Sequence, residues 1–116
     1  MNDQQLLELA AKALDDPKLF ANTTGAPWQY WIGFCEEMQC DVTRIWNPLE
    51  DDGDALRLAM RLGICIQFIP QCDTVQVYQE REFTAEPFNV HVAGLGDIET
   101  RRVITQAAAE IGKAME

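Results

Sequence analysis

The feature that most constrains this chain is residues 46–69 (WNPLEDDGDALRLAMRLGICIQFI), where a helical pattern runs directly into a strand pattern. Two helix starts fit it. Asn47 is followed by a glutamate three residues later, and Asp51 stands at the same spacing before Asp54, as in a capping box. A glycine inside the first turn favours the later start. Gly63 supplies the left-handed residue that ends many helices. The stretch therefore predicts a capped amphipathic helix followed at once by a buried strand.

Hydrophobic periodicity places the other elements around this unit. A first helix is predicted after Asn2 or Asp3, three strands follow the central helix, and Asp97 is expected to cap a final helix. Residues 28–34 alternate in polarity and are rich in aromatics, which predicts another strand, with a short one possible by pattern at residues 42–45. The predicted fold class is α+β in one domain. A three-stranded antiparallel sheet, with room for a fourth strand, packs with about three helices like an α/β/α sandwich.

Alternation in the last three strands predicts one apolar and one polar sheet face. Ile66, Val75, Val77, Val90 and Val92 belong to the apolar face in this interpretation. The opposite face is the candidate interaction or ligand surface, together with one tryptophan of the aromatic segment: Gln67, Gln76, Tyr78, Asn89, His91 and Trp31. A mixed polar and aromatic face of this kind suits a protein interface. For the aromatic segment 28–34 a core position is favoured over a surface position.

Two stretches of the chain resemble a known family. They are WNPLEDDGDALRLAMRLGI, within residues 46–69, and TRRVITQAAAEIGKAM, within residues 97–115. Both resemble the phage ABA-sandwich domain family, which comprises small proteins of tailed phages and prophages. The resemblance covers about half of the chain. It implies a sandwich fold and a phage origin, and it brings no known activity and no catalytic residues.

The charge of the chain restricts its partners. Nine basic and nineteen acidic side chains give a formal net charge of −10, which repels phosphate backbones, so no nucleic-acid partner is expected. A weaker alternative is an acidic DNA mimic that blocks a host enzyme, although such a charge ordinarily serves solubility. No apolar run reaches the ~18 residues of a membrane span. The N-terminus lacks the features of a signal peptide, so we expect no membrane partner and a location in the cytoplasm of the bacterial host.

The four cysteines do not form a metal-binding motif. They are expected to be reduced in a cytoplasmic chain. The first two are separated by four residues, which is wider than a zinc knuckle, and no second fixed pair follows. The positions are Cys35, Cys40, Cys65 and Cys72. Whether they approach His91 in the fold is left open, and helix capping explains the acidic residues 50–54 without calcium. We therefore expect no metal and no cofactor.

No catalytic constellation can be identified by spacing. His91 is the only histidine, and no orienting carboxylate accompanies it in a recognisable motif. A phosphate-binding loop, a serine nucleophile elbow and an HExxH helix are all missing from the sequence. The leading hypothesis is a non-catalytic interaction module that binds another phage or host protein, with a homo-oligomer left open. The alternative is a small-molecule-binding or enzymatic domain that uses the polar sheet face around His91 and Tyr78.

Overall fold

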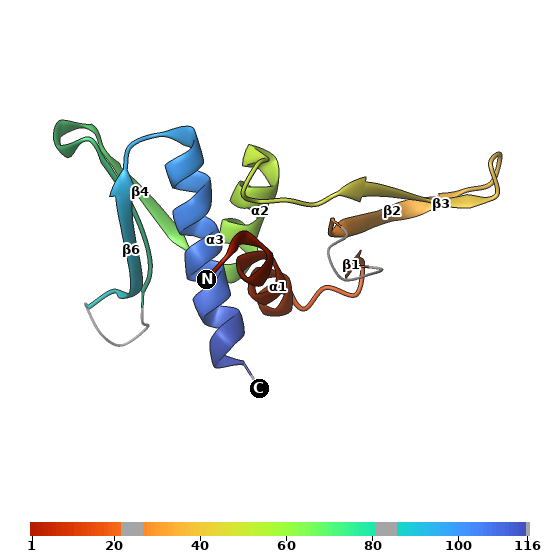
Figure 1. Ribbon diagram of the computed structural model, residues 1–116, viewed down its shortest axis with the longest axis horizontal. Helices are drawn as coiled ribbons and strands as arrows, with labels where there is room; N and C mark the ends of the chain where they lie inside the picture. Colours follow the sequence, from red (N-terminus) through yellow and green to blue (C-terminus); the bar gives the residue numbers. More distant parts are fainter. Residues whose placement is uncertain (22–26, 81–85, 116) are drawn as a thin grey trace.

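The computed structural model describes residues 1–21, 27–80 and 86–115, and within them the fold class is α+β, as predicted (Figure 1). Three helices accompany two antiparallel sheets of three strands each, with orders β1-β2-β3 and β4-β5-β6, instead of the single sheet that the sequence suggests. The elements in chain order are α1 (Asp3–Leu14), β1 (Leu19–Phe20), β2 (Gln29–Cys35), β3 (Cys40–Ile45), α2 (Asp52–Leu62), β4 (Cys65–Ile69), the 3-10 turn η1 (Pro70–Cys72), β5 (Thr74–Gln79), β6 (Phe88–Gly94) and α3 (Asp97–Ala114).

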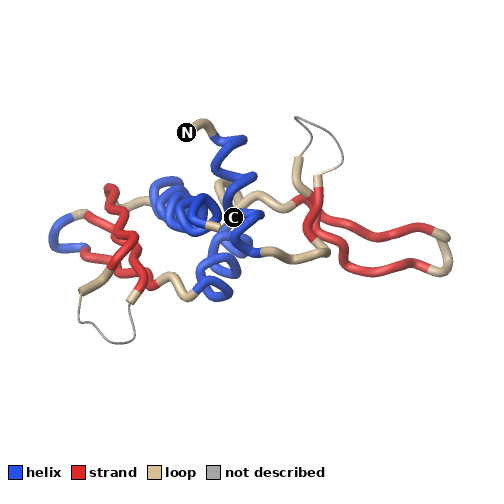
Figure 2. The backbone as a smooth tube through the Cα atoms, turned by 90° about the horizontal axis from the view of Figure 1, so that it is seen from below, coloured by secondary structure: helices blue, strands red, loops and turns tan. Residues whose placement is uncertain are grey.

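The helices form a layer between the two sheets. In both views the sheet β4-β5-β6 lies at one end of the molecule, the helices lie in the middle, and β2 and β3 project as a long hairpin at the other end (Figures 1 and 2). The longest dimension is 51 Å, against 30 and 25 Å for the other two. Helix α3 covers one face of β4-β5-β6, and no helix in the described ranges covers the other face. The layer order therefore differs from the α/β/α arrangement that the sequence suggests.

The core lies where the helices meet each other and the face of β4-β5-β6 that they cover. Small alanines on α1, α2 and α3 let the helices approach closely, while the valines of β5 fill the space beneath α3. The buried members are Ala10, Ala11, Leu19, Trp46, Ala55, Leu58, Ala59, Ile64, Val75, Val77, Val103, Ile104, Ala107 and Ala108. The stretch 46–69 supplies residues from its turn, its helix and the start of its strand, so it occupies the centre of the molecule.

Helix α2 begins at the later of the two predicted starts. Asp51 is its N-cap, and the Asp51 carboxylate accepts a hydrogen bond of 2.8 Å from the backbone N–H of Asp54. Asn47 forms a tight turn, in which its side-chain oxygen accepts the backbone N–H of Leu49 at 3.0 Å. Gly63 ends the helix with φ 69°, a left-handed conformation that glycine adopts without steric cost.

Helix α3 begins differently from the prediction. Its N-cap is Gly96, and Asp97 is the first helical residue, so the assignment of Asp97 as the cap is wrong. The hydroxyl of Thr100 donates to the Gly96 carbonyl at 2.6 Å. Asp97 still places a negative charge in the first turn, where the helix dipole is favourable for it.

A β-bulge shifts the pairing of β5 with β6. The register is regular up to the pair of Val77 with His91 and resumes at the pair of Gln79 with Phe88. Asn89 lies in this bulge with φ 54°, a conformation that asparagine tolerates better than most residues. A bulge adds one residue to one strand. The side chains beyond it therefore lie on the opposite face from the one that unbroken alternation predicts.

The bulge overturns the predicted faces of β6. His91 is paired with Val77, which is fully buried, so His91 lies on the helix-covered face. Val92 is paired with Gln76 on the open face, and both Val90 and Val92 are exposed. The sequence places these valines inside and His91 outside, which is wrong for this strand.

Helices α1 and α3 cross most closely at Gly112, and this contact gives the first testable prediction. A Cβ at Gly112 would collide with the backbone carbonyl oxygen of Leu9. Replacing a helical glycine by alanine normally stabilises by about 1 kcal/mol. Here Gly112→Ala is expected to destabilise by about 1–3 kcal/mol through overpacking, measured as the free energy of unfolding in urea.

Gly33→Ala is the matched control. Gly33 lies in β2 with no atom within 4 Å of a built Cβ, and its φ is not positive. Its replacement should change the free energy of unfolding by less than about 0.5 kcal/mol, as for surface positions. A Gly112→Ala variant as stable as the parent would show that the two helices do not cross at this distance.

Candidate functional site

The base of the projecting hairpin is fixed by a buried carboxylate, Asp54. Its side chain is only 1% exposed. Oδ1 accepts hydrogen bonds from Arg44 of β3 at 2.7 Å and from Arg57 of α2 at 2.9 Å, while Oδ2 accepts the backbone N–H of Asn47 at 3.0 Å. Burial alone raises the pKa of Asp54, but these three donors outweigh it and hold the pKa below its ordinary value of 3.8. Asp54 therefore stays ionised and joins β3, the turn before α2, and α2 itself.

A second carboxylate, Asp16, fixes the hairpin from the side of β2. Its Oδ2 accepts the hydroxyl of Tyr30 at 3.0 Å and Nη1 of Arg61 at 2.7 Å. Its Oδ1 accepts the backbone N–H of Lys18 at 3.0 Å. The Arg61 guanidinium, with help from Lys18 and Tyr30, lowers the pKa of Asp16 despite its burial. The Asp16 carboxylate thus connects the segment after α1 with the strand β2 and the helix α2.

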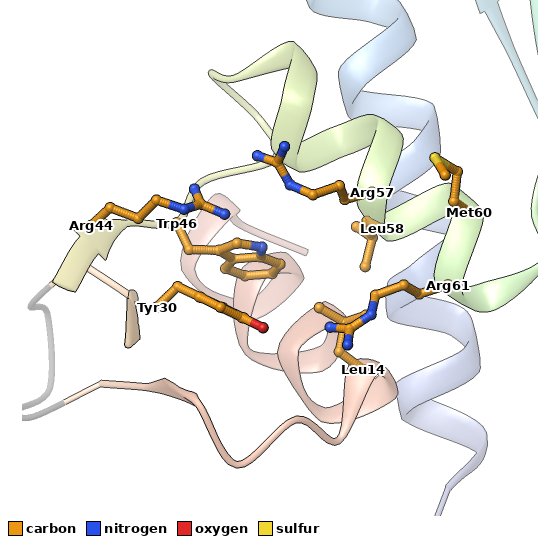
Figure 3. Close-up of a pocket in the computed structure, with 8 residues that line it drawn as sticks. All are labelled: Leu14, Tyr30, Arg44, Trp46, Arg57, Leu58, Met60 and Arg61. Carbon is orange, nitrogen blue, oxygen red and sulfur yellow. The ribbon is translucent and has the colours of Figure 1, made fainter. Parts of the chain in front are cut away.

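The three arginines that bind these two carboxylates line a cavity between the hairpin and α2 (Figure 3). Its volume is about 320 Å³, at the lower end of the range for ligand sites of roughly 300–1,000 Å³. Apolar side chains from α1, the turn before α2, and α2 line it: Leu14, Trp46, Leu58 and Met60. Tyr30 and the arginines 44, 57 and 61 complete the lining. Figure 3 shows the guanidinium groups of the three arginines around the rings of Trp46 and Tyr30. The cavity therefore combines an apolar floor with a cationic rim.

The aromatic segment of β2 is divided between core and surface. Trp28 packs edge-on against the buried Trp46, with ring centroids 6.5 Å apart, and Tyr30 packs against the core. Farther along the strand, Ile32 and Phe34 are 57% and 55% exposed. The core position that the sequence favours for this segment thus holds only at the base of the hairpin.

The outer half of the hairpin carries an unusual number of exposed apolar side chains. They lie on β2, on β3 and at the tip between the strands: Ile32, Phe34, Met38 and Val42. An isolated two-stranded hairpin is marginal in water, so these side chains gain little from the pairing of the two strands alone. Exposed apolar groups gathered on one projecting element are typical of interaction sites.

The residues predicted to share one polar sheet face do not lie together. Gln67 and Gln76 are neighbours on the open face of β4-β5-β6, where their side chains share a hydrogen bond of 2.6 Å. Tyr78 is on the same face. By contrast, the Asn89 side chain donates to the carbonyl of Ala107 in α3 at 2.9 Å, so it points toward the helices.

His91 and Trp31 also lie away from the predicted surface. The His91 ring shares a hydrogen bond of 2.8 Å with Asn89 on the helix-covered face, so His91 and Tyr78 are on opposite sides of the sheet. Trp31 belongs to β2 in the other sheet, where its indole N–H donates to Asp41 at 3.1 Å. A single site around His91 and Tyr78 is therefore contradicted by the geometry.

The cysteines do not gather around His91. Cys35 and Cys40 are cross-strand partners near the hairpin tip, and Cys72 is in η1. Cys65 is in the sheet of His91, but it pairs with Tyr78 on the opposite face. All four are free thiols. Across residues 1–21, 27–80 and 86–115, no group of three or more histidine, cysteine, aspartate or glutamate side chains is arranged to hold a metal ion. In those same ranges, no helix combines the length and the apolar character needed to cross a bilayer.

The sequence interpretation missed the arginines of the cavity. Arg57 and Arg61 are 56% and 51% exposed on α2, so a pattern of polar and apolar positions gives no sign that they also line a cavity. One local signal was present, because Asp54 and Arg57 stand three residues apart on a helix, a spacing at which opposite charges meet. The contacts from Arg44 to Asp54 and from Arg61 to Asp16 join different elements and have no such signal.

The Asp54 network gives a prediction for Asp54→Asn. The amide keeps the shape of the carboxylate but loses the charge that binds Arg44 and Arg57, and hydrogen bonds to charged groups contribute about 1.5–3 kcal/mol each. Because both arginines are partly exposed, they are resolvated when the pair is lost, so the total loss should be about 2–4 kcal/mol at pH 7, measured by urea unfolding. Asp52→Asn is the control, since Asp52 is 81% exposed and pairs at the surface with Arg101, so a loss below about 1 kcal/mol is expected.

The same network predicts a pH dependence. Since the pKa of Asp54 is lower in the folded state than its ordinary value of 3.8, its contribution is complete above that pH and disappears as the pH falls through the folded pKa. The stability difference between the parent and Asp54→Asn should therefore shrink below about pH 4. A difference that stays constant down to pH 2 would contradict an ionised Asp54.

Protonation of His91 should destabilise the folded protein. Burial lowers the pKa of His91 below 6.5, while Glu110 partly opposes this shift. The unfolded chain therefore binds a proton at a higher pH than the folded protein, and stability should fall as the pH drops below about 6.5. In His91→Gln, the loss of unfolding free energy between pH 7.5 and pH 5.5 should be smaller than in the parent. An equal loss in both proteins would show that His91 titrates normally.

Comparison with known proteins does not add to this geometry. A scan of the chain against protein-family models found no match, and searches of curated proteins and of solved structures found none either. The resemblance of residues 46–69 and 97–115 to the phage ABA-sandwich domain family therefore stays a prediction from the sequence.

Proposed function

We propose that this protein is a non-catalytic interaction module of a phage or prophage, and that the β2–β3 hairpin is its contact element. The single observation that carries this proposal is the set of exposed apolar side chains on the outer hairpin, defined above, on an element that projects from the helices. The sequence resemblance supports the phage origin. It also favours the cytoplasm of the bacterial host as the location.

The hairpin is held in a way that suits binding. Asp54 fixes β3 through Arg44, and Asp16 fixes β2 through Tyr30, so both strands are anchored at the base of the hairpin. A preorganised element loses less conformational entropy on binding than a flexible one. The anchored base therefore presents the apolar tip to a partner at a smaller entropic cost.

Charge indicates the chemistry of the partner surface. Glu36, Glu37 and Asp41 surround the apolar side chains near the hairpin tip and are exposed. Complementary charge at the rim of an interface speeds association and selects partners. We therefore expect a partner protein with an apolar groove bordered by lysine or arginine.

The structure gives less support to the other hypotheses from the sequence. One ligand site cannot use both His91 and Tyr78, because the sheet separates these residues. The DNA-mimic hypothesis depends on net charge, and no contact described above adds to it.

The test compares capture by the parent with capture by a hairpin variant, Ile32→Thr with Phe34→Ser. Each protein is used as bait in lysate of the infected host, and bound proteins are quantified by mass spectrometry. Because both side chains are exposed, the variant should keep its unfolding temperature within a few degrees, as for surface substitutions. The expected result is one stoichiometric partner whose recovery falls at least about tenfold with the variant, equivalent to about 1.4 kcal/mol.

The matched control is Val90→Thr with Val92→Thr on the open face of β4-β5-β6, where both valines are also exposed. This control should recover the partner as well as the parent does. Loss of the partner from the control but not from the hairpin variant would move the interface to the sheet. A folded parent that captures no protein would contradict the interaction proposal itself.

A further inference from the structure

The cavity at the base of the hairpin has a composition that its structural role does not require. The chain has only nine lysines and arginines against nineteen acidic residues, yet three arginines line this one cavity. The cavity floor is apolar and aromatic, and its volume of about 320 Å³ lies in the range of small-molecule sites. Fixing the hairpin needs ion pairs, but it does not need an open space between them.

The charges around this cavity do not cancel among the buried groups. Arg44 and Arg57 share one buried carboxylate, Asp54, while Arg61 pairs with Asp16. Three positive charges therefore face two buried negative ones. The remaining nearby acid, Asp51, is 3.9 Å from Arg57, and the two side chains are about equally exposed, at 58% and 56%. The excess of arginines over largely buried carboxylates is therefore balanced only from the solvent side, by Asp51.

The arginines also retain donor groups. In the described part of the chain, each guanidinium bonds its carboxylate through one terminal nitrogen: Nη1 of Arg44, Nη2 of Arg57 and Nη1 of Arg61. A guanidinium has five N–H donors in a planar fork that suits a carboxylate. Asp54 and Asp16 orient these forks from behind, much as outer groups orient the ligands of a binding site.

The aromatic lining indicates the rest of the ligand. Tyr30 lines the cavity between the guanidinium groups beside the buried Trp46, and the Arg44 guanidinium carbon lies 5.4 Å from the centroid of the Tyr30 ring (Figure 3). A planar apolar group can pack on the Tyr30 ring while its charged end reaches the arginines. A carboxylate presents two oxygens in one plane, which matches the fork of a guanidinium.

We propose that the cavity lined by Tyr30, Trp46 and the arginines 44, 57 and 61 binds a small aromatic carboxylate. The carboxylate bonds the free donors of the arginines, and the ring lies on the aromatic floor. This inference goes beyond the interaction module proposed above and does not depend on the hairpin partner.

The test uses 2-naphthoate as the probe and the neutral 2-naphthamide as its uncharged counterpart. Binding is measured by calorimetry, and the site is located by the shift of the Trp46 indole N–H signal in NMR spectra. The expected result is saturable binding of 2-naphthoate that shifts Trp46, with an affinity at least about tenfold higher than that of 2-naphthamide, equivalent to one charge-assisted hydrogen bond of about 1.4 kcal/mol. Equal affinity for both compounds would overturn the proposal, as would naphthoate binding that leaves Trp46 unshifted or no binding at all.

A pair of methionines provides a matched test of the charge. Met60 lines the cavity and is 71% exposed, whereas Met38 is at the hairpin tip and is 75% exposed. Both accept glutamate without burying it, so both variants should fold. Met60→Glu should weaken 2-naphthoate binding at least about tenfold by repulsion, and Met38→Glu should leave it within twofold, because its charge is beyond the Debye length of about 10 Å. Equal effects of the two variants would contradict a site in this cavity.

Arg57→Gln tests the donors directly. It leaves Asp54 bonded to Arg44 and Asn47, so the hairpin keeps its anchor. Its affinity for 2-naphthoate should fall at least about tenfold, whereas Arg102→Gln, at a surface arginine paired with Asp3, should change nothing. Unchanged binding by a folded Arg57→Gln protein would show that the anion is held elsewhere.

Discussion

The fold depends on one buried charge, the carboxylate of Asp54. A carboxylate that is 1% exposed is tolerated only when donors replace its lost water, and here two guanidinium groups and one backbone N–H do so. Those donors come from three separate parts of the chain. The hairpin buries too little apolar surface to be stable alone, so its position follows from this contact and from the parallel one at Asp16. The packing of Trp28 against Trp46 holds the base of the hairpin as well.

The parts of the fold that could be predicted are those fixed by neighbouring residues. The start of α2 at Asp51 and its end at Gly63 follow from capping chemistry, which is local. Strand pairing is not local. The division into two sheets arises because β2 pairs with β1 and β3, and none of these strands pairs with those that follow α2. The reversed faces of β6 depend on a single bulge at Asn89, and alternation cannot reveal a bulge because it assumes an unbroken register.

The candidate site could not be predicted for the same reason, because its contacts join residues that are far apart in the sequence. The spacing of Asp51 and Asp54 predicts capping, and Asp51 does cap α2, but Asp54 has its functional partners ten and seven residues back, at Arg44 and Asn47. Asp16 and Arg61 are 45 residues apart in sequence. A pattern of polar and apolar positions identifies which side chains are charged, but it cannot show which charges the fold brings together. The arginine cavity was missed for this reason, whereas the predicted polar face failed because of the bulge at Asn89 and because Trp31 lies in the other sheet.

The cavity and the hairpin share their structural elements, and this limits how they can be studied separately. Arg44 and Tyr30 line the cavity and also belong to the strands of the hairpin, while Asp54 orients two of the cavity arginines. A change at any of these three positions alters the anchor and the cavity together. A ligand that contacts Arg44 and Tyr30 can influence the hairpin only through a difference in its affinity for two hairpin positions. Arg57 lies on α2, outside the hairpin, and so separates recognition of an anion from the support of the hairpin.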